Sequence, residues 1–233
     1  MSSSKVQYSV DSSVATIVLD DGKVNVLSPA MQGEINDALD TAEKDGAGAV
    51  VLAGNQKVFS AGFDLNVLRG GDGEAALDML TGGFELSVRL LSFPRPVVMA
   101  CTGPAVAMAS FLLCSGDHRV GAPDYRIQAN EVAIGMTMPY AAIEIMKVRL
   151  TRSAFQRVNS LATVFAGTDA VAAGWLDELV EPAAVLSRAQ QAARDALSLD
   201  AAAHAASKLR ARAEALDAIR AAIKSEFGRE SRR

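Results

Sequence analysis

A segment of small residues near position 60 is the part of the chain best suited to chemistry by backbone N–H groups. Residues 58–65 follow a β-rich run at residues 49–54, so the segment is expected just past the end of a strand. Gly62 can take a positive φ at low cost, which allows a tight turn. Such a turn can leave the N–H of Phe63 directed into open space. An unpaired N–H aimed at a cavity is what a developing oxyanion needs.

A second segment offers N–H groups in a similar way. Residues 102–110 follow a strand-like run at residues 96–100 and open an apolar helix. The N–H groups at the start of a helix have no partner within the helix, and they lie at the positive end of its dipole. The sequence therefore contains two candidate donor segments for one oxyanion.

The elements that must carry these segments alternate between strands and helices. Strands are predicted at residues 6–10, 14–19, 49–52, 96–100 and 118–122, and helices at residues 30–45, 73–93 and 107–116. The helix at 73–93 is expected to be irregular around Gly82 and Gly83. The alternation indicates an α/β fold with right-handed crossovers, although pattern alone does not separate a doubly wound sheet from other α/β arrangements. Residues 183–227 are rich in Ala, Arg, Leu and Lys, which favours helix.

Composition narrows the class of protein. The 233 residues, half of them hydrophobic, suffice for one domain or for one core with a helical appendage. A net charge of −4 argues against nucleic acid as a partner. The apolar stretches are too short or too broken for a signal peptide or a membrane span, so no membrane partner is expected. Cys101 and Cys114 lie in apolar runs without the spacing of a disulfide framework or a metal site, which fits buried thiols in a reducing cytoplasm.

The end of the chain is locally basic. Its cations are Lys208, Arg210, Arg212, Arg220, Lys224, Arg229, Arg232 and Arg233. The simpler interpretation is a solvated helix face and tail. The alternative is attraction for the phosphates of a nucleotide-bearing substrate.

Taken in order, several motifs resemble those of the crotonase (enoyl-CoA hydratase/isomerase) superfamily. They are Asn25-Val26-Leu27, residues 59–65, Thr102-Gly103 leading to Ser115-Gly116-Asp117, residues 131–135 and residues 173–180. Each is weak alone, but the ordered set is specific and spans about residues 14–180. The resemblance implies a crotonase-like α/β spiral of repeated ββα units over residues 1–182 and a helical C-terminal region over residues 183–233. It also implies a homotrimer or a hexamer packed through that region.

The same resemblance assigns the site residues. Phe63 matches the first oxyanion-hole position and Met108 the second, each acting through its N–H. Relatives usually have a glycine run around the second position, where this chain has Ala107-Met108-Ala109. The N–H survives that change, but the methionine side chain must find a place and could narrow the acyl pocket. Coenzyme A is expected to arrive as part of an acyl-CoA thioester substrate, with no separate cofactor, and to lie along Asn25, Val26, Leu27, Ala61, Asp64 and Leu65.

The acids of the site decide which reaction is favoured. Hydratases of the superfamily have two glutamates; the first position matches Phe111 here, and the second matches Glu131. Glu131 borders an apolar run, which tends to raise a carboxyl pKa and suits proton transfer near neutral pH. One carboxylate is enough to move a double bond by 1,3-proton transfer, whereas adding water uses two. The pattern therefore favours an enoyl-CoA isomerase, with a two-acid hydratase as the alternative. Glu144 is expected to pair with Lys147 or Arg149 rather than to replace the missing acid.

Two other functions stay open at this point. The first is an acyl-CoA-binding protein that kept the fold and lost fast chemistry, which Phe111 and the lost glycine run would explain. Retention of Glu131 argues against it. The second, and weaker, is an assembly or RNA-associated scaffold that uses the basic tail.

Overall fold

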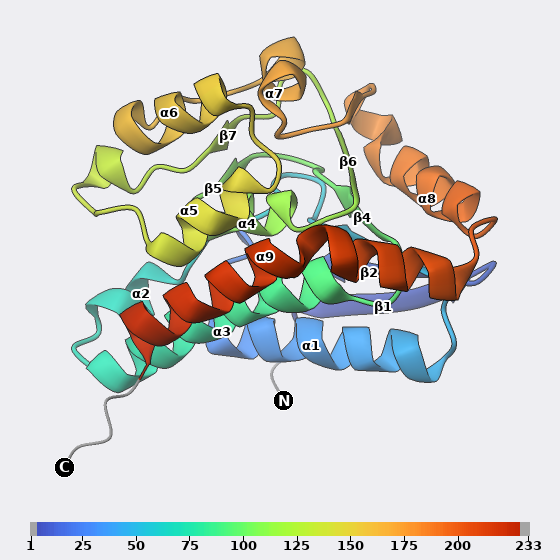
Figure 1. Ribbon diagram of the computed structural model, residues 1–233, viewed down its shortest axis with the longest axis horizontal. Coiled ribbons are helices and arrows are strands. Elements are labelled where there is room, and N and C mark those ends of the chain that lie inside the picture. The colour runs from blue at the N-terminus through green and yellow to red at the C-terminus, as the bar shows by residue number, and fades with distance from the viewer. Residues whose placement is uncertain (1–3, 229–233) are drawn as a thin grey trace.

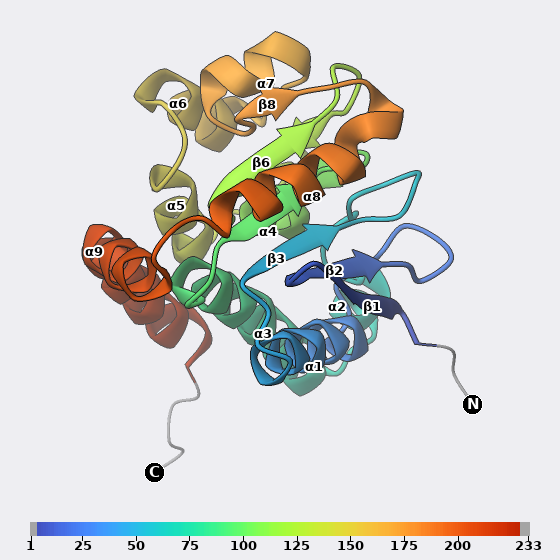
Figure 2. The ribbon, with the colours of Figure 1, turned by 90° about the vertical axis from the view of Figure 1, so that its right-hand side faces the viewer.

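The computed structural model describes residues 4–228, and a twisted six-stranded sheet lies at its centre (Figures 1 and 2). In spatial order the strands are β1 (Val6–Asp11), β2 (Val14–Leu19), β3 (Ala49–Ala53), β4 (Val97–Ala100), β6 (His118–Gly121) and β8 (Glu178–Leu179). The β1–β2 hairpin is antiparallel, and every other neighbouring pair is parallel. The predicted strands are therefore confirmed to within a residue or two at each end.

A narrow second sheet accompanies the main one. It consists of β5 (Ala105–Val106) paired in parallel with β7 (Ile127–Gln128), and single β-bridges extend it to Ser60 on one side and Phe165 on the other. Ser60 follows β3, β5 follows β4 and β7 follows β6. Each turn of the chain thus adds one position to both sheets before it enters a helical segment, which is the repeated ββα spiral that the family resemblance implied.

Helices cover both faces of the main sheet, and the strand residues alternate between two cores. The face with α1 (Pro29–Lys44), α3 (Gly73–Ser92) and α4 (Met108–Cys114) receives Ile17, Leu52 and Met99. The opposite face, under α8 (Val185–Ala196), receives the intervening residues, such as Val51 and Val98. Period-2 alternation into two apolar layers is what strands buried on both faces require.

Five further helices and two short 3-10 turns complete the described part of the chain. They are α2 (Leu65–Arg69), α5 (Tyr140–Lys147), α6 (Arg152–Leu161), α7 (Gly167–Ala173), α9 (Ala201–Phe227) and the two short 3-10 turns η1 (Val132–Ile134) and η2 (Pro182–Ala184). None of the helices among residues 4–228 is long and apolar enough to cross a membrane. Cys101 and Cys114 are both buried, and burial raises the pKa of each thiol to about 12.

The expected irregularity at Gly82 and Gly83 was wrong, because α3 runs without a break from Gly73 to Ser92. The two glycines instead allow neighbours to come close. A Cβ on Gly83 would lie 2.5 Å from Cε1 of Phe63, and one on Gly82 would lie 2.5 Å from Oε1 of Gln32. Glycine is therefore needed here for close approach rather than for a bend.

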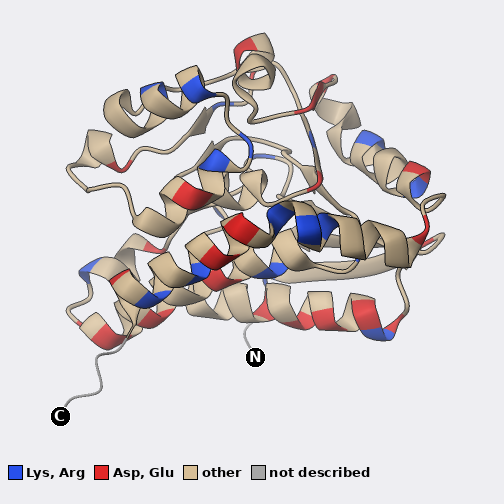
Figure 3. Cartoon of the chain, in the orientation of Figure 1, with Lys and Arg blue, Asp and Glu red and all other residues tan. Residues whose placement is uncertain are grey.

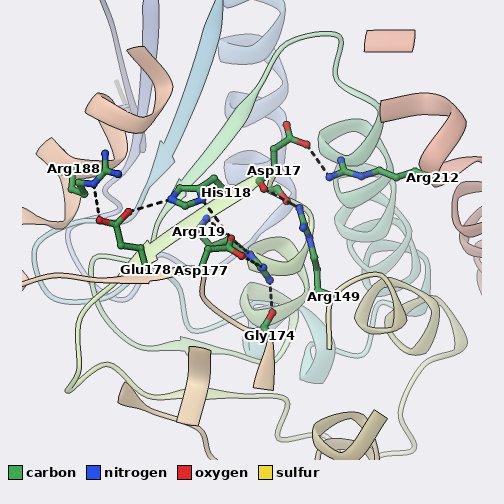
Figure 4. A network of polar contacts seen from close by, with 10 residues as sticks. Asp117, His118, Arg119, Arg149, Gly174, Asp177, Glu178, Arg188 and Arg212 are labelled. Carbon is green, nitrogen blue, oxygen red and sulfur yellow. Dashed lines mark hydrogen bonds and ion pairs between the residues drawn. The ribbon is translucent and has the colours of Figure 1, made fainter. Parts of the chain in front are cut away.

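The C-terminal helix α9 lies across α3 and α5 and is anchored by charge (Figure 1). Lys208 is buried and donates to Asp117 at 2.7 Å, and Arg212 contacts the other oxygen of Asp117 at 2.8 Å. Figure 4 shows Asp117 and Arg212 at one end of a polar network that continues through Arg149.

The expectation that the basic residues form a solvated helix face was therefore wrong for two of them. A carboxylate that is largely enclosed holds Lys208 and Arg212 against the core. Arg210, Arg220 and Lys224 are exposed, and Figure 3 shows both signs of charge along α9. Arg229, Arg232 and Arg233 lie outside the described residues. The domain boundary at residue 182 stays a prediction.

Candidate active site

Three loops of the spiral reach the same edge of the second sheet. Ser60 bridges to Ala105, and Ala105 is in register with Ile127, so the three residues form one row. The residues that follow this row in each of the three segments must then leave the second sheet next to one another. Phe63 and Met108 each come three residues after their position in the row, and Glu131 comes four after. The topology therefore brings together the three residues that were predicted as catalytic from separate parts of the sequence.

The first two loops are in contact. A Cβ on Gly62 would lie 2.8 Å from the carbonyl oxygen of Val106 and 3.3 Å from the backbone nitrogen of Met108. Gly62 has φ +87°, a conformation that costs glycine little. The turn that carries Phe63 is thus pressed against the start of α4.

The N–H groups of Phe63 and Met108 donate no hydrogen bond within the part of the chain that the structure describes. Their neighbours do: the N–H of Gly62 donates to Oγ of Ser60 at 3.1 Å, and that of Ala107 donates to the carbonyl of Gln128 at 2.8 Å. Met108 is the first residue of α4, where the helix leaves its N–H groups unpaired and the dipole is positive. Two free donors on adjoining loops are the arrangement that an oxyanion hole needs.

Ala107 has an unusual backbone. Its φ is 52° and its ψ is −127°, which L-residues rarely adopt. The conformation turns the chain between β5 and α4 while keeping the Ala107–Gln128 hydrogen bond. Superfamily members are expected to have glycine in this run, and the conformation supplies the physical reason.

The Phe63 loop is supported from behind by the segment before α1. The N–H of Leu27 donates to the carbonyl of Gly62 at 2.8 Å, and that of Ala61 donates to the carbonyl of Val24 at 3.0 Å. The hydroxyl of Ser60 donates to the carbonyl of Asn25 at 2.6 Å. Any movement of residues 24–27 would therefore be transmitted to Phe63.

Asn25 has its polar side chain committed to this support. The side chain is fully buried, and its amide donates to the carbonyls of Leu19 at 2.9 Å and Phe59 at 3.2 Å. Its oxygen accepts from the N–H of Asp21 at 3.1 Å. Its backbone is engaged as well, since the Asn25 N–H donates to Oδ1 of Asp21 at 2.9 Å, so the structure places Asn25 as a residue that holds the loop.

The other five residues predicted to lie along coenzyme A differ in exposure. Leu27 is fully buried in the core, Val26 and Ala61 are half-buried, and Leu65 is 47 % exposed. Asp64 caps α2 by accepting from the N–H of Asn66 at 2.9 Å. Ala61 and Leu65 line the cavity described next, and the binding role of the whole set stays a prediction.

A cavity of about 510 Å³ opens beside these loops. Its wall is mainly apolar, with α2, α3, α4 and the segment around η1 contributing Leu65, Leu68, Leu80, Phe84, Phe111, Ile134 and Met136. The polar side chains in its wall are Arg69, Asn130 and Glu131. A pocket of this size, apolar with a few converging polar groups, is typical of a small-molecule site.

Glu131 is the acid of this cavity. Its side chain comes from the loop between β7 and η1, the residue is only 6 % exposed, and Oε2 has no hydrogen-bond partner among the described residues. Burial raises the pKa of the Glu131 carboxyl to about 7. Its own backbone carbonyl accepts from the N–H of Met136 at 2.8 Å, which fixes the loop. A carboxyl poised near neutrality can both take and return a proton.

Met108 does not narrow the cavity. Its side chain is fully buried in the core, and the cavity wall contains its neighbours Ala107 and Phe111 instead. The suggestion that this side chain could intrude on the acyl pocket was therefore wrong. The backbone nitrogen of Met108 lies beside the Gly62 turn, while the side chain is buried in the core.

Phe111, which was predicted to replace the first acid, forms part of an aromatic wall. Its ring stacks on Phe84 with centroids 6.3 Å apart, and Phe84 meets Phe63 edge to face at 6.1 Å. Glu144 is not in the wall; its carboxylate pairs with Lys147 at 2.6 Å, as predicted.

Sequence reasoning missed two polar residues of the wall, Asn130 and Arg69. Asn130 has a buried Oδ1 without a partner among the described residues, and Arg69 stands at the end of α2. The position of Asn130 next to Glu131 was the available signal for the first, whereas nothing in the pattern around Arg69 indicated the second. Among residues 4–228, no group of three or more His, Cys, Asp or Glu side chains could hold a metal ion.

Comparison with known proteins agrees with this geometry. A crystal structure of enoyl-CoA hydratase EchA3 from Mycobacterium ulcerans is 60 % identical, with a TM-score of 0.93 over 95 % of this chain and 97 % of that one. An apo structure of an enoyl-CoA isomerase from Mycobacterium tuberculosis is 59 % identical, with a TM-score of 0.93 over 96 % of this chain and 97 % of that one.

Similarity extends to more distant sequences. A probable enoyl-CoA hydratase, EchA17, of Mycobacterium avium is 30 % identical over 193 residues, which are 79 % of this chain and 72 % of the relative. The sequence model of the family described as enoyl-CoA hydratase/isomerase matches residues 9–228. The chain therefore belongs to the enoyl-CoA hydratase/isomerase family of enzymes.

Proposed function

We propose that this enzyme moves the double bond of an enoyl-CoA thioester by a proton transfer through Glu131. The observation that carries the proposal is the composition of the cavity wall. Among the described residues Glu131 is its one carboxylate, and Phe111 stands where a second acid would be required.

The proposed reaction uses these groups in two proton transfers. The thioester oxygen of a 3-enoyl-CoA accepts hydrogen bonds from the N–H groups of Phe63 and Met108. The ionised carboxylate of Glu131 takes a proton from C2, and the electron pair of that C–H bond delocalises over the thioester and the double bond as a dienolate. The same carboxyl then returns its proton to C4, which gives the 2-enoyl-CoA. Atoms balance without water, and Glu131 ends in its starting state.

The two N–H donors stabilise the oxyanion, and the raised pKa of Glu131 suits it to proton transfer. An oxyanion-hole donor contributes about 3–4 kcal/mol to stabilising the charged oxygen. A pKa near 7 leaves the Glu131 carboxylate available at neutral pH and makes it a stronger base than an ordinary glutamate. The apolar wall excludes water, which favours return of the proton to carbon over hydration of the product.

Water addition is the second candidate. The similar structure from M. ulcerans is named a hydratase, and the M. tuberculosis protein is named an isomerase in one structure and a probable enoyl-CoA hydratase in another. A two-acid hydratase holds one water between two carboxyl groups. The Phe111 ring can neither accept nor donate such a proton, so hydration here would need a second acid from outside the cavity wall.

The deciding experiment assays purified protein with a 3-enoyl-CoA and a 2-enoyl-CoA of the same length, with products identified by chromatography and mass. Conversion of the 3-enoyl to the 2-enoyl thioester is expected. Efficient formation of a 3-hydroxyacyl-CoA from the 2-enoyl substrate would overturn the one-base reaction.

Replacement of Glu131 distinguishes the proposed enzyme from the alternative, an acyl-CoA-binding protein. Glu131→Gln should lower kcat by about 10²- to 10⁴-fold, since it removes the one carboxylate of the described cavity wall, while the Kd for a saturated acyl-CoA stays within a few-fold. Glu144→Gln is the matched control, because that carboxylate pairs with Lys147 outside the cavity. Unchanged turnover in Glu131→Gln would exclude the proposed role.

Assembly and location belong to the same proposal. We infer a homotrimer or a hexamer, and a cytoplasmic enzyme, from the family resemblance. Exposed apolar side chains near the cavity, such as Ile134 at 54 % and Tyr140 at 66 %, support a covering subunit. Light scattering should give three or six times the 24.4 kDa of one chain, and a monomer would contradict it.

A further inference from the structure

Helix α3 separates the acyl cavity from a second hollow. Leu80 and Phe84 line the cavity, while Thr81 and Val88, on another side of the same helix, line an outer groove of about 460 Å³. The other wall of that groove is α9, with Ile223 and Phe227 among its residues. Figure 1 shows α9 lying along α3, so the groove runs between two adjacent helices.

Two stacked rings form the partition between the two spaces. Phe84 is fully buried and lines the cavity, and Phe227 lines the groove. Their centroids are 5.4 Å apart and their planes differ by 10°, so the rings lie face against face. Phe84 also stacks on Phe111, which lines the cavity too.

Phe227 lies at a helix end that also contacts the start of α5. It is the last residue of α9, and the preceding Glu226 accepts a hydrogen bond from the N–H of Tyr140 at 2.9 Å. Tyr140 begins α5, just after the segment that carries Glu131. The last turn of α9 therefore contacts both α3, through Phe84, and the start of α5, through Tyr140.

Given the proposed acyl-thioester substrate, we infer that Phe227 limits the length of the acyl chain by closing the cavity at the Phe84–Phe227 pair. An acyl chain that outgrows the cavity meets this partition. If the outer ring is removed, the chain can pass between α3 and α9 into the groove, where Val88 and Ile223 offer apolar contact. Phe227 is a positioning residue, because it acts on the substrate through Phe84.

The test measures the Kd of saturated acyl-CoAs from butanoyl to hexadecanoyl. These thioesters cannot react, so the result does not depend on whether the enzyme isomerises or hydrates. Each buried CH₂ is worth about a fourfold gain in affinity. In the unaltered protein the Kd should stop falling once the chain reaches the partition. In Phe227→Ala it should keep falling for at least two more carbons, a gain of about tenfold or more.

Three further variants isolate the cause. Phe227→Tyr keeps the ring and should retain the original length profile, whereas Phe227→Leu should shift it partway and serves if the alanine variant does not fold. Adding Thr81→Trp to Phe227→Ala fills the groove and should abolish the gain. Identical length profiles in Phe227→Ala, Phe227→Leu and the unaltered protein, with short-chain binding intact, would overturn the inference. If the unaltered protein bound no acyl-CoA of any length, short chains included, the proposed acyl-CoA substrate itself would be contradicted.

Discussion

Gly62 lies so close to Met108 that no Cβ fits freely between the two donor loops. A Cβ on Gly62 would come within 3.3 Å of the Met108 nitrogen and within 2.8 Å of the Val106 carbonyl oxygen. Because backbone atoms cannot swing aside as the end of a side chain can, an added methyl group must push the loops apart. The distance between the two N–H donors thus depends on one glycine.

Gly62→Ala should therefore lower kcat by about 10²-fold or more, the usual effect of losing one oxyanion donor. Gly71→Ala is the matched control. Gly71 also has a positive φ, at +80°, but nothing lies within 4 Å of its Cβ position. The control should carry similar backbone strain and little loss of kcat. Equal losses in the two variants would show that general strain, and not donor geometry, is responsible.

Ala107→Gly should stabilise the fold. An alanine at φ 52° and ψ −127° stores roughly 1–3 kcal/mol of strain, and glycine relieves it while costing about 0.4–1 kcal/mol in chain entropy. The expected gain in the free energy of unfolding is about 0.5–2 kcal/mol by denaturant titration. Ala166→Gly, at an extended position with φ −154°, should instead be destabilising. A loss of stability in Ala107→Gly would contradict the strained conformation.

Glu131 should make the protein less stable as the pH rises from about 4.5 to about 7. Its folded pKa of about 7 lies above the ordinary value of 4.5 because burial disfavours the charged form. Between those two values the unfolded chain binds fewer protons than the folded one, so the free energy of unfolding falls with pH. The total is at most about 3 kcal/mol. Above pH 7 this contribution is constant.

Glu131→Gln should remove that pH dependence, and the variant should be more stable than the unaltered protein at pH 8. Chemical denaturation at several pH values measures the slope. The rate of isomerisation should show the opposite trend, rising as the carboxylate forms near pH 7. Parallel stability curves for the two proteins from pH 4.5 to 8 would mean that the Glu131 pKa is ordinary.

Much of the fold was predictable from the sequence, because strands and long helices each have a characteristic period of hydrophobic residues. The helix at Pro29–Lys44 has both its start signals, Ser28 as the cap and Pro29 in the first turn, and it begins within a residue of its predicted position. The strands β5 and β7 could not be predicted, because two residues show no period. Yet their register is what aligns Phe63, Met108 and Glu131.

The residue types of the candidate site were predictable, but the directions in which their side chains point were not. Whether the Met108 side chain enters the cavity depends on the backbone conformation of Ala107. The conformational preferences of alanine do not indicate its positive φ. The burial of Lys208 depends on Asp117, which lies 91 residues earlier in the chain. The stacking of Phe227 on Phe84 likewise joins two helices that are distant in sequence. Pairings of this kind come from tertiary packing and leave no local signal.

Asp117 should be far more important to stability than an exposed acid. Its carboxylate accepts from Lys208 at 2.7 Å, from Arg212 at 2.8 Å and from the N–H of Val97 at 2.8 Å. Asp117→Asn leaves these cations without their counterion and should cost about 3–5 kcal/mol. Asp217→Asn, at an exposed pair 3.6 Å from Arg220, should change stability by less than about 1 kcal/mol. Similar effects at both positions would refute the anchoring of α9.

Phe111→Glu should convert the one-acid site toward a two-acid site. The new carboxyl would share the cavity with Glu131, and like charges in an apolar space raise the pKa of one partner. One acid and one base would then be present together at neutral pH, which is what water addition requires. Hydration of a 2-enoyl-CoA should rise at least tenfold over the unaltered enzyme. The loss of stacking on Phe84 and the buried carboxyl should cost about 2–4 kcal/mol of stability.

Phe111→Leu is the control, because it opens a similar space without an acid. It should leave hydration at the background level and retain most of the isomerase activity. If Phe111→Leu gained hydration as well, water entry and not the second carboxyl would be limiting. If neither variant gained hydration while both folded, the position of the Phe111 ring could not explain why this site favours moving a proton over adding water.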